Sequence, residues 1–115
     1  MTSYNRGDVV LVLYPHSDLR TVKKRPALVL QAHQAQTDLP QKIIAMITSN
    51  LERTGATRIR VNKDSPQGKS MGLLTDSVIV TDNIATVLDQ EIDRSIGTCA
   101  LMSDVDQALR LVLGL

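Results

Sequence analysis

Two apolar runs of strand length constrain the fold of this chain more than any other feature. They occupy residues 27–31 and 42–48, and their Val, Ile, Leu, Ala and Met residues follow no helical repeat. Runs of this length and composition indicate buried strands. Each run adjoins a polar cluster: Lys23-Lys24-Arg25 before the first, and Thr48-Ser49-Asn50 at the end of the second. Neighbouring strands would bring Arg25 and Thr48 together, a cation and a hydroxyl of the kind that bind phosphate.

Other segments have the same strand character. Apolar or alternating runs predict strands at 9–14, 57–61, 73–80, 84–87 and 96–101. The polar segments 15–25 and 62–72 are expected to be loops, and a short helical turn is expected over 89–94. Pro26 fits the first residue of its strand, because proline cannot donate to a ladder.

The C-terminal segment has a helical period. Its apolar residues recur at i, i+3, i+4 and i+7, the pattern of one face of an amphipathic helix: Val105, Ala108, Leu109 and Val112. Ser103 with Asp106 predicts a start like a capping box, and Gly114 predicts the end. Several short antiparallel strands and one terminal helix predict an α+β fold, mainly β, built as a small barrel or a twisted sheet closed by the helix.

Composition limits the class of protein. The 115 residues fit one domain, 1–115, whose core contains no Phe or Trp and is filled by aliphatic side chains. Cys99 is the only cysteine, which excludes an internal disulfide. No window reaches the length of about 18 apolar residues that a membrane span needs, and the N-terminus lacks the apolar stretch of a signal peptide. We therefore expect a cytoplasmic protein with no membrane association.

Charge is distributed unevenly along the chain. Residues 15–25 carry four cations against one acid, residues 52–70 carry five against two, and residues 82–106 carry six acids against one cation. Two basic segments suggest a surface for an anionic ligand such as nucleic acid. The alternative is an ordinary solvated surface, because charge patterning alone fixes no function.

Several short motifs carry no function. Arg6-Gly7-Asp8 spells an adhesion tripeptide but fits a turn into the first strand. Gly68-Lys69-Ser70 lacks the earlier glycine of a phosphate-binding loop, because Lys63 occupies that position. His16 and His33 are not spaced as a ligand pair, and one cysteine makes no thiolate site, so we expect neither a metal nor a cofactor.

Arg25 and Thr48 suit phosphodiester chemistry. When a 2′-hydroxyl attacks the neighbouring phosphate, charge builds on the phosphoryl oxygens, and a fixed guanidinium with a hydroxyl can stabilise it. The alternative is a surface ion pair at Arg25 and a plain strand end at Thr48. His16, close to Asp18, either moves protons near neutral pH or is a surface loop residue.

Four segments, in order and spacing, resemble the MazF/PemK family of toxins from type II toxin–antitoxin systems. They are Arg6-Gly7-Asp8-Val9-Val10-Leu11-Val12, Lys24-Arg25-Pro26-Ala27-Leu28-Val29-Leu30, Ile47-Thr48-Ser49 and Gly72-Leu73-Leu74-Thr75-Asp76-Ser77-Val78. The resemblance extends over nearly the whole chain. It implies an SH3-like small barrel of antiparallel strands, as in CcdB and PemK, with a C-terminal helix.

The resemblance also implies a function. Family members are homodimeric, metal-independent endoribonucleases (mRNA interferases) that cut single-stranded RNA at short sequences and leave 2′,3′-cyclic phosphate and 5′-hydroxyl ends. The disordered tail of a cognate antitoxin folds into the dimer's groove and blocks the RNA site. The family's arginine before proline matches Arg25, and its strand-end Thr or Ser matches Thr48.

The remaining site residues follow from these two. Asp82 is the first candidate for the general base and His16 the second. The residues expected to bind RNA are Arg20, Lys23, Lys24, Ser49, Asn50, Arg53 and Asp76. Only Tyr4 and Tyr14 are available for base stacking, so hydrogen bonds and backbone groups are expected to read the bases.

This chain departs from the family at two places. Residues 18–23 lack the glycines of the family's first loop, and Leu19 stands where some relatives carry a histidine. Ala85 stands where relatives tend to carry an arginine, and Lys23, Lys24 or Arg53 is expected to replace that phosphate contact. These departures favour an alternative, a non-catalytic module of the same fold that inhibits a protein target or only binds an antitoxin.

Overall fold

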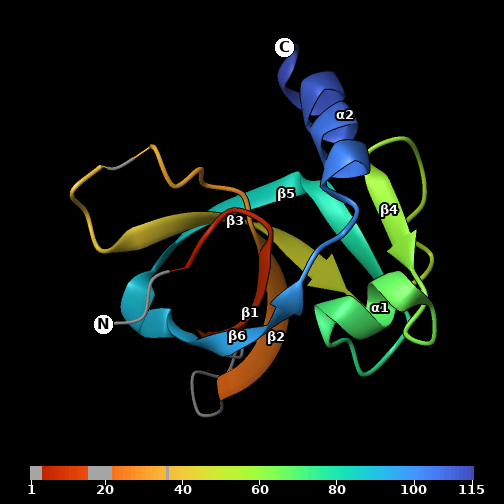
Figure 1. Ribbon diagram of the computed structural model, residues 1–115, viewed down its shortest axis with the longest axis horizontal. Helices are drawn as coiled ribbons and strands as arrows, with labels where there is room; N and C mark the ends of the chain where they lie inside the picture. Colours follow the sequence, from red (N-terminus) through yellow and green to blue (C-terminus); the bar gives the residue numbers. More distant parts are fainter. Residues whose placement is uncertain (1–3, 16–21, 36) are drawn as a thin grey trace.

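A computed structural model of the chain describes residues 4–15, 22–35 and 37–115. Six antiparallel strands form one sheet in the order β4-β5-β3-β2-β1-β6 (Figure 1). The elements along the chain are β1 (Asp8–Pro15), β2 (Val22–Val29), β3 (Gln41–Thr48), β4 (Arg58–Val61), α1 (Pro66–Met71), β5 (Ser77–Leu88), the 3₁₀ helix η1 (Asp89–Glu91), β6 (Ile92–Thr98) and α2 (Met102–Leu113). The α+β, mainly β class with a C-terminal helix is therefore confirmed.

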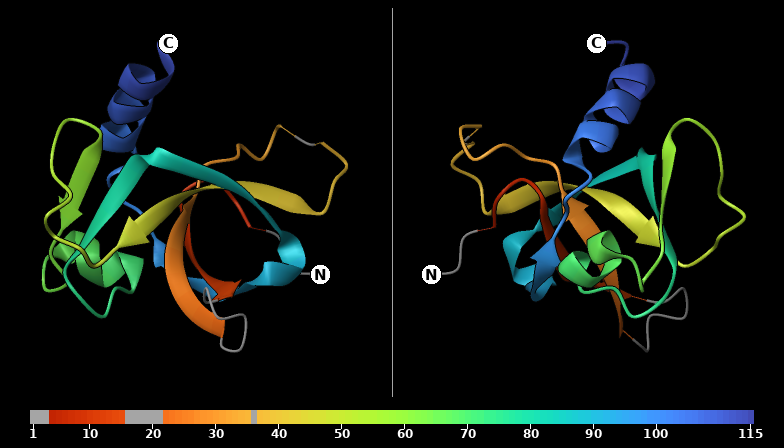
Figure 2. Two further views of the ribbon diagram at one scale, coloured as in Figure 1. Left: turned by 180° about the vertical axis from the view of Figure 1, so that it is seen from behind. Right: turned by 45° about the vertical axis from the view of Figure 1, so that its right-hand side comes forward.

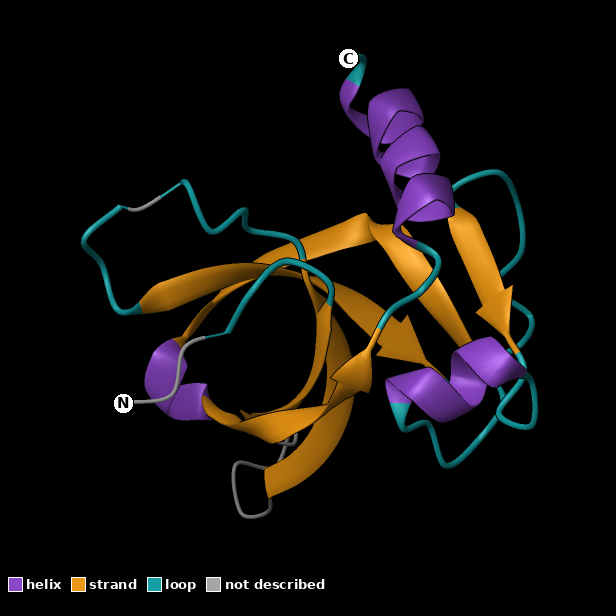
Figure 3. Ribbon diagram, viewed as in Figure 1, coloured by secondary structure: helices purple, strands orange, loops and turns teal. Residues whose placement is uncertain are grey.

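The sheet is strongly curved but not closed. Its edge strands are β4 and β6, and no ladder joins them within the described ranges. The short helix α1 lies at this opening and packs against β6, whereas α2 packs against β5 and β4 (Figures 2 and 3). Gly97 permits this contact, because a Cβ there would collide with the Ser70 carbonyl oxygen in α1. A small helix thus covers the gap that a closed barrel would fill with hydrogen bonds.

The core has two parts, one on each face of the central strands. Alternate residues of β1 and β2 divide between them, as a period of two requires. One cluster joins the sheet to α2 through residues such as Val9, Leu28 and Leu109. The other contains Val10, Val12, Ala27, Val29 and Ile44. No helix in the described part of the chain has the length and hydrophobicity needed to cross a bilayer.

The segment 62–72 was expected to be a loop, but it contains α1. Ser65 caps this helix by accepting a hydrogen bond from the Gly68 amide at 3.0 Å, and Pro66 occupies its first turn. Gly72 ends it in the left-handed conformation at φ 71°. These are ordinary helix signals, and the high polarity of the segment concealed them.

The strand expected at 73–80 and the one at 84–87 are one strand, β5. The polar residues between them form a bulge and not a break, and the first four residues of the expected 73–80 strand precede β5. The turn expected over 89–94 is helical only in η1, and β6 occupies 92–98 in place of 96–101. The second strand also starts earlier than expected, at Val22, so the cations Lys23 to Arg25 lie within β2.

The start of α2 differs from the expected capping box. The helix begins at Met102, its N-cap residue Leu101 makes no side-chain cap bond, and Asp106 forms an ion pair with Arg6 instead. This ion pair ties the segment before β1 to the helix. Gly114 ends α2 in the left-handed conformation, as expected, and Arg6-Gly7 forms the expected turn into β1.

Candidate functional site

The candidate site forms where β2 and β3 separate. The ladder between them pairs Ala27 with Met46, Leu28 with Ala45 and Val29 with Ile44. It stops at Pro26, which has no N–H to donate. The residues of β2 before Pro26 remain paired with β1 alone. Pro26 is therefore not the first residue of its strand but marks the point at which β3 leaves it.

The separated strand ends enclose a cavity of about 500 Å³. Its walls come from β2, β3, β4 and the bulge of β5, with one residue from the loop after β3. The lining residues are Arg25, Met46, Ile47, Thr48, Arg53, Arg58, Val80, Asp82 and Asn83. The structure thus brings Arg25 and Thr48 together, as the two apolar runs predicted.

A turn after β3 orients Thr48 and Arg53. The Thr48 hydroxyl oxygen accepts a hydrogen bond from the Asn50 amide at 3.1 Å, which leaves its proton free to donate. The Asn50 side chain accepts from the Glu52 amide at 3.1 Å, and the Arg53 amide donates to the Asn50 carbonyl at 3.3 Å. This turn directs Arg53 back to the cavity. Asn50 therefore shapes the site, whereas Ser49 is exposed and does not line the cavity.

The bulge in β5 directs Asp82 to the cavity. Ala45 of β3 pairs with Ile84, but Met46 pairs with Val80, so the three residues between have no partner in β3. Thr81 anchors the bulge, because its amide and its hydroxyl both donate to the Thr57 carbonyl, at 3.0 and 2.7 Å. The next residue, Asp82, is thereby held beside β4.

Arg58 of β4 holds the Asp82 carboxylate in a fork. Its Nε donates to Oδ1 at 3.0 Å and its Nη2 to Oδ2 at 2.8 Å, while its Nη1 donates to the Thr54 carbonyl at 2.9 Å. The Thr57 hydroxyl donates to Oδ1 at 3.3 Å. The hydrogen bonds from Arg58 are the largest cause that lowers the pKa of Asp82 below its ordinary value. The carboxylate is therefore ionised and fully engaged near neutral pH.

The cavity attracts anions. It contains three arginines and one acid, and Arg58 already neutralises that acid. In the described part of the chain, the guanidinium groups of Arg25 and Arg53 have no hydrogen-bonded or ionic partner. Two guanidinium groups that have no partner among the described residues thus line the same cavity as Thr48, which is an arrangement suited to a phosphate.

The other predicted RNA contacts that the structure describes do not line this cavity. The alternation of β2 places Lys23 on the face of Arg25 and Lys24 on the opposite face. Lys24 pairs with Asp93 at 3.1 Å and lines a separate cavity with Arg94 and Leu74. Asp76 accepts a hydrogen bond from the Lys63 amide at 2.9 Å and so holds the loop before α1. His16 and Arg20 lie outside the described residues.

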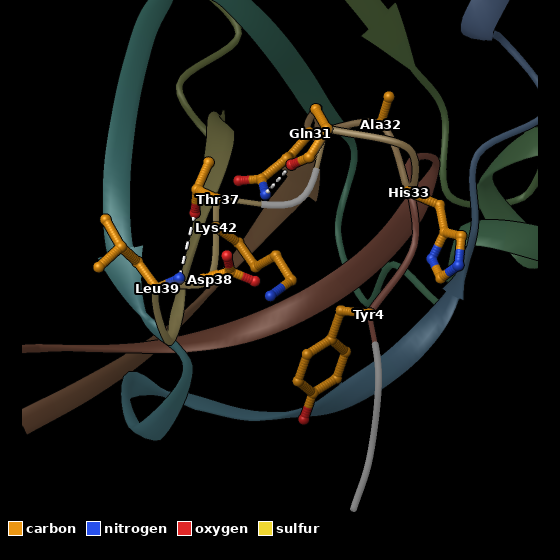
Figure 4. Close-up of a pocket in the computed structure, with 9 residues that line it drawn as sticks. Tyr4, Gln31, Ala32, His33, Thr37, Asp38, Leu39 and Lys42 are labelled. Carbon is orange, nitrogen blue, oxygen red and sulfur yellow. Dashed lines mark hydrogen bonds between the residues drawn. The ribbon is translucent and has the colours of Figure 1, made fainter.

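A further cavity, of about 240 Å³, lies at the opposite end of β3. Figure 4 shows its walls, in which Tyr4, Asp38 and Lys42 come from three segments. Lys42, half-buried, pairs with Asp89 at 3.1 Å, so its charge is already balanced. This cavity is a poorer anion site than the one at Arg25. In the described ranges no three His, Cys, Asp or Glu side chains converge as metal ligands.

Arg58 is the site residue that sequence reasoning missed. Arg58-Ile59-Arg60-Val61 alternates along β4, with Ile59 and Val61 packed against the first core cluster. That alternation directs Arg58 and Arg60 to the other face. The signal was present in the expected strand at 57–61, but the pairing of Arg58 with Val80 of β5 was needed to place it beside Asp82.

Fold and site together define a small β-rich protein with a cationic cavity at the end of its central strands. The chain matches the family described as PemK-like, MazF-like toxin of type II toxin–antitoxin system over residues 5–113. It therefore belongs to the MazF/PemK toxin family. No curated protein sequence matches it.

Solved structures share this fold. An endoribonuclease in complex with its cognate antitoxin, from a mycobacterial species, is 23% identical with a TM-score of 0.75 over 98% of this chain and 97% of its own. The Mycobacterium tuberculosis toxin MazF-mt6 is 24% identical with a TM-score of 0.73 over 94% and 97%. An endoribonuclease from a mycobacterial species is 25% identical with a TM-score of 0.71 over 100% and 95%.

The Arg58–Asp82 pair predicts how Asp82 titrates. Because its folded-state pKa is lowered, the pair stabilises the fold above the pKa of the unfolded chain, and this stabilisation is lost as the pH falls through the folded value. We expect an NMR titration of the Asp82 carboxyl carbon to give a pKa below the reference of about 3.9, and Arg58→Ala to raise it. Titration of Asp82 near neutral pH would contradict the assignment.

Proposed function

We propose that this chain is the toxin of a type II toxin–antitoxin pair and that it is a metal-independent endoribonuclease acting on single-stranded RNA, an mRNA interferase of the cytoplasm. The observation that carries the proposal is the cavity that Arg25 and Thr48 line together, in which the Arg25 guanidinium has no partner among the described residues. Membership of the MazF/PemK family supports the same reading, as do endoribonucleases among structures of this fold.

The proposed reaction is intramolecular. The 2′-oxygen of the RNA attacks the adjacent phosphorus, the bond to the 5′-oxygen of the next nucleotide breaks, and the products carry a 2′,3′-cyclic phosphate and a 5′-hydroxyl. Charge builds on the non-bridging phosphoryl oxygens as the attack proceeds. Arg25 stabilises that charge, and Thr48 donates a hydrogen bond to one of these oxygens. Arg53, at the rim, attracts the backbone phosphates.

Asp82 is a weak candidate for the general base. Both its oxygens accept hydrogen bonds from Arg58, and a carboxylate with a lowered pKa accepts a proton poorly at neutral pH. We assign Asp82 to holding Arg58 in place, which leaves the base to the second candidate, His16. Ala85 is half-buried against the second core cluster, and we assign the phosphate contact that it cannot make to Arg53, which lines the cavity.

The proposed partners are a cognate antitoxin and a second copy of the chain. The antitoxin follows from the family and from the antitoxin complex among the similar structures. An apolar groove of about 670 Å³ between α2 and the strands β3 and β5 supports the second copy. Ile43, Ile84 and Leu113 line it and are 41%, 37% and 55% exposed. Two such faces would cover each other about a twofold axis.

Replacement of either catalytic side chain tests the mechanism. We expect Arg25→Ala and Thr48→Ala each to slow cleavage of single-stranded RNA at least about tenfold, because each removes a donor fixed in the transition state. Both side chains lie at the site and not in the core, so the melting temperature should change little. Arg94→Ala is the matched control, since it removes one exposed cation from the opposite face. Unchanged cleavage in both site variants would exclude this mechanism.

The apolar groove predicts the oligomeric state. We expect light scattering to show a dimer for the natural chain and a mass near the 12.6 kDa of one chain for Ile43→Lys, because a buried unpaired lysine opposes association. Leu74→Lys, at a residue 89% exposed and outside the groove, should remain dimeric. A monomeric natural chain, or a dimer that tolerates Ile43→Lys, would contradict this interface.

A further inference from the structure

We propose that the Arg58 guanidinium is a stacking platform for one base of the bound RNA, next to the scissile phosphate. This inference rests on the proposed function, because it names how the same site holds its substrate. It assigns to Arg58 the role that an aromatic ring has in many proteins that bind single strands.

The first argument is the shortage of aromatic side chains. The chain has no Phe or Trp and only two tyrosines. Tyr4 lines the cavity at the other end of β3, and the side chain of Tyr14 lies outside the described part of the chain. Among the described residues, none that lines the Arg25 cavity is aromatic. Single-stranded RNA is nevertheless held largely by its unstacked bases, which need a flat partner.

The second argument is the geometry of Arg58. Its guanidinium is fixed at three nitrogens, by both Asp82 oxygens and by the Thr54 carbonyl, at 2.8 to 3.0 Å. These bonds lie in the guanidinium plane and use its edges, so they leave the faces of the plane for stacking. The side chain is 25% exposed and lines the cavity. Its charge is balanced by Asp82, which suits it to a base better than to a phosphate.

The third argument is its position relative to the reacting groups. Arg58 pairs with Val80 of β5, and Val80 pairs with Met46, two residues before Thr48 in β3. Residues directly opposite in an antiparallel pair lie about 5 Å apart. The platform thus lies about 10 Å across the sheet from β3 and about 7 Å along it from Thr48, at two strands and two residues respectively, while Arg53 and Arg25 remain for the backbone. Arg58 and Thr48 line the same cavity, so a base stacked on Arg58 lies beside the phosphate held at Thr48.

The test uses a single-stranded oligonucleotide that spans a cleavage site mapped with the natural enzyme. Its sugars carry 2′-O-methyl groups, so it binds but cannot be cut. Each base in turn is replaced by an abasic sugar, and affinity is measured for the natural protein and for Arg58→Lys, which keeps the charge and loses the plane. Arg60→Lys is the matched control, because Arg60 lies on the same strand and face, and its side chain bonds only Asn62, at 3.3 Å, among the described residues.

We expect one abasic position beside the scissile phosphate to weaken binding by the natural protein about tenfold. The affinity of Arg58→Lys for the intact strand should be reduced by about the same factor. The same abasic position should not reduce the affinity of this variant further. Arg60→Lys should retain the base-dependent loss. Thermal unfolding of both variants shows whether the fold is kept.

Two results would overturn the platform. One is an equal loss on base removal in the natural protein and in a folded Arg58→Lys variant. The other is binding by the natural protein that depends on no single base. Either result leaves cleavage at Arg25 and Thr48 intact. If the natural protein neither cuts nor binds single-stranded RNA, the proposed function fails, and the platform fails with it.

Discussion

The end of the ladder between β2 and β3 determines the rest of the site. Pro26 cannot donate a hydrogen bond, and the last pair of that ladder is Ala27 with Met46. Beyond it, β2 continues with β1 alone, and β3 turns away at Thr48. The cavity that contains Arg25 and Thr48 exists because the two strands separate there and not one residue pair later. The site therefore depends on three features of the sequence together: a proline, the cation before it, and the hydroxyl at the end of the next strand.

A second irregularity completes this site. The bulge in β5 leaves Thr81, Asp82 and Asn83 without partners in β3, and Asp82 reaches Arg58 of β4. Arg25, which precedes Pro26, and Asp82, which lies in the bulge, line the same cavity. Regular ladders above and below, with apolar residues on both faces, fix their relative positions. The site is thus shaped by a rigid scaffold, as catalysis by preorganised groups requires.

Much of this could be predicted from the sequence. The proximity of Arg25 and Thr48 was predicted from two apolar runs that form neighbouring strands, and this prediction required only the local sequence pattern of each strand. The partner of Asp82 did not, because it depends on a bulge and on the pairing of β4 with β5, and the residues concerned lie 24 positions apart. The assignment of Lys24 to the Arg25 site overlooked alternation, since the expected strand began at residue 27 and the observed one begins at Val22. Helix α1 was missed because its polar sequence outweighed its Ser65 cap and Pro66.

The products of RNA cleavage test the central claim most directly. A defined single-stranded transcript is incubated with the purified chain in EDTA, and the ends of the fragments are identified chemically. The account predicts cuts at a short preferred sequence, with a 2′,3′-cyclic phosphate on one side and a 5′-hydroxyl on the other, because Arg25 and Thr48 act on a phosphate attacked by its own 2′-oxygen. Intact RNA in the presence of a folded protein that binds an antitoxin peptide tightly would contradict it and would favour a non-catalytic toxin fold.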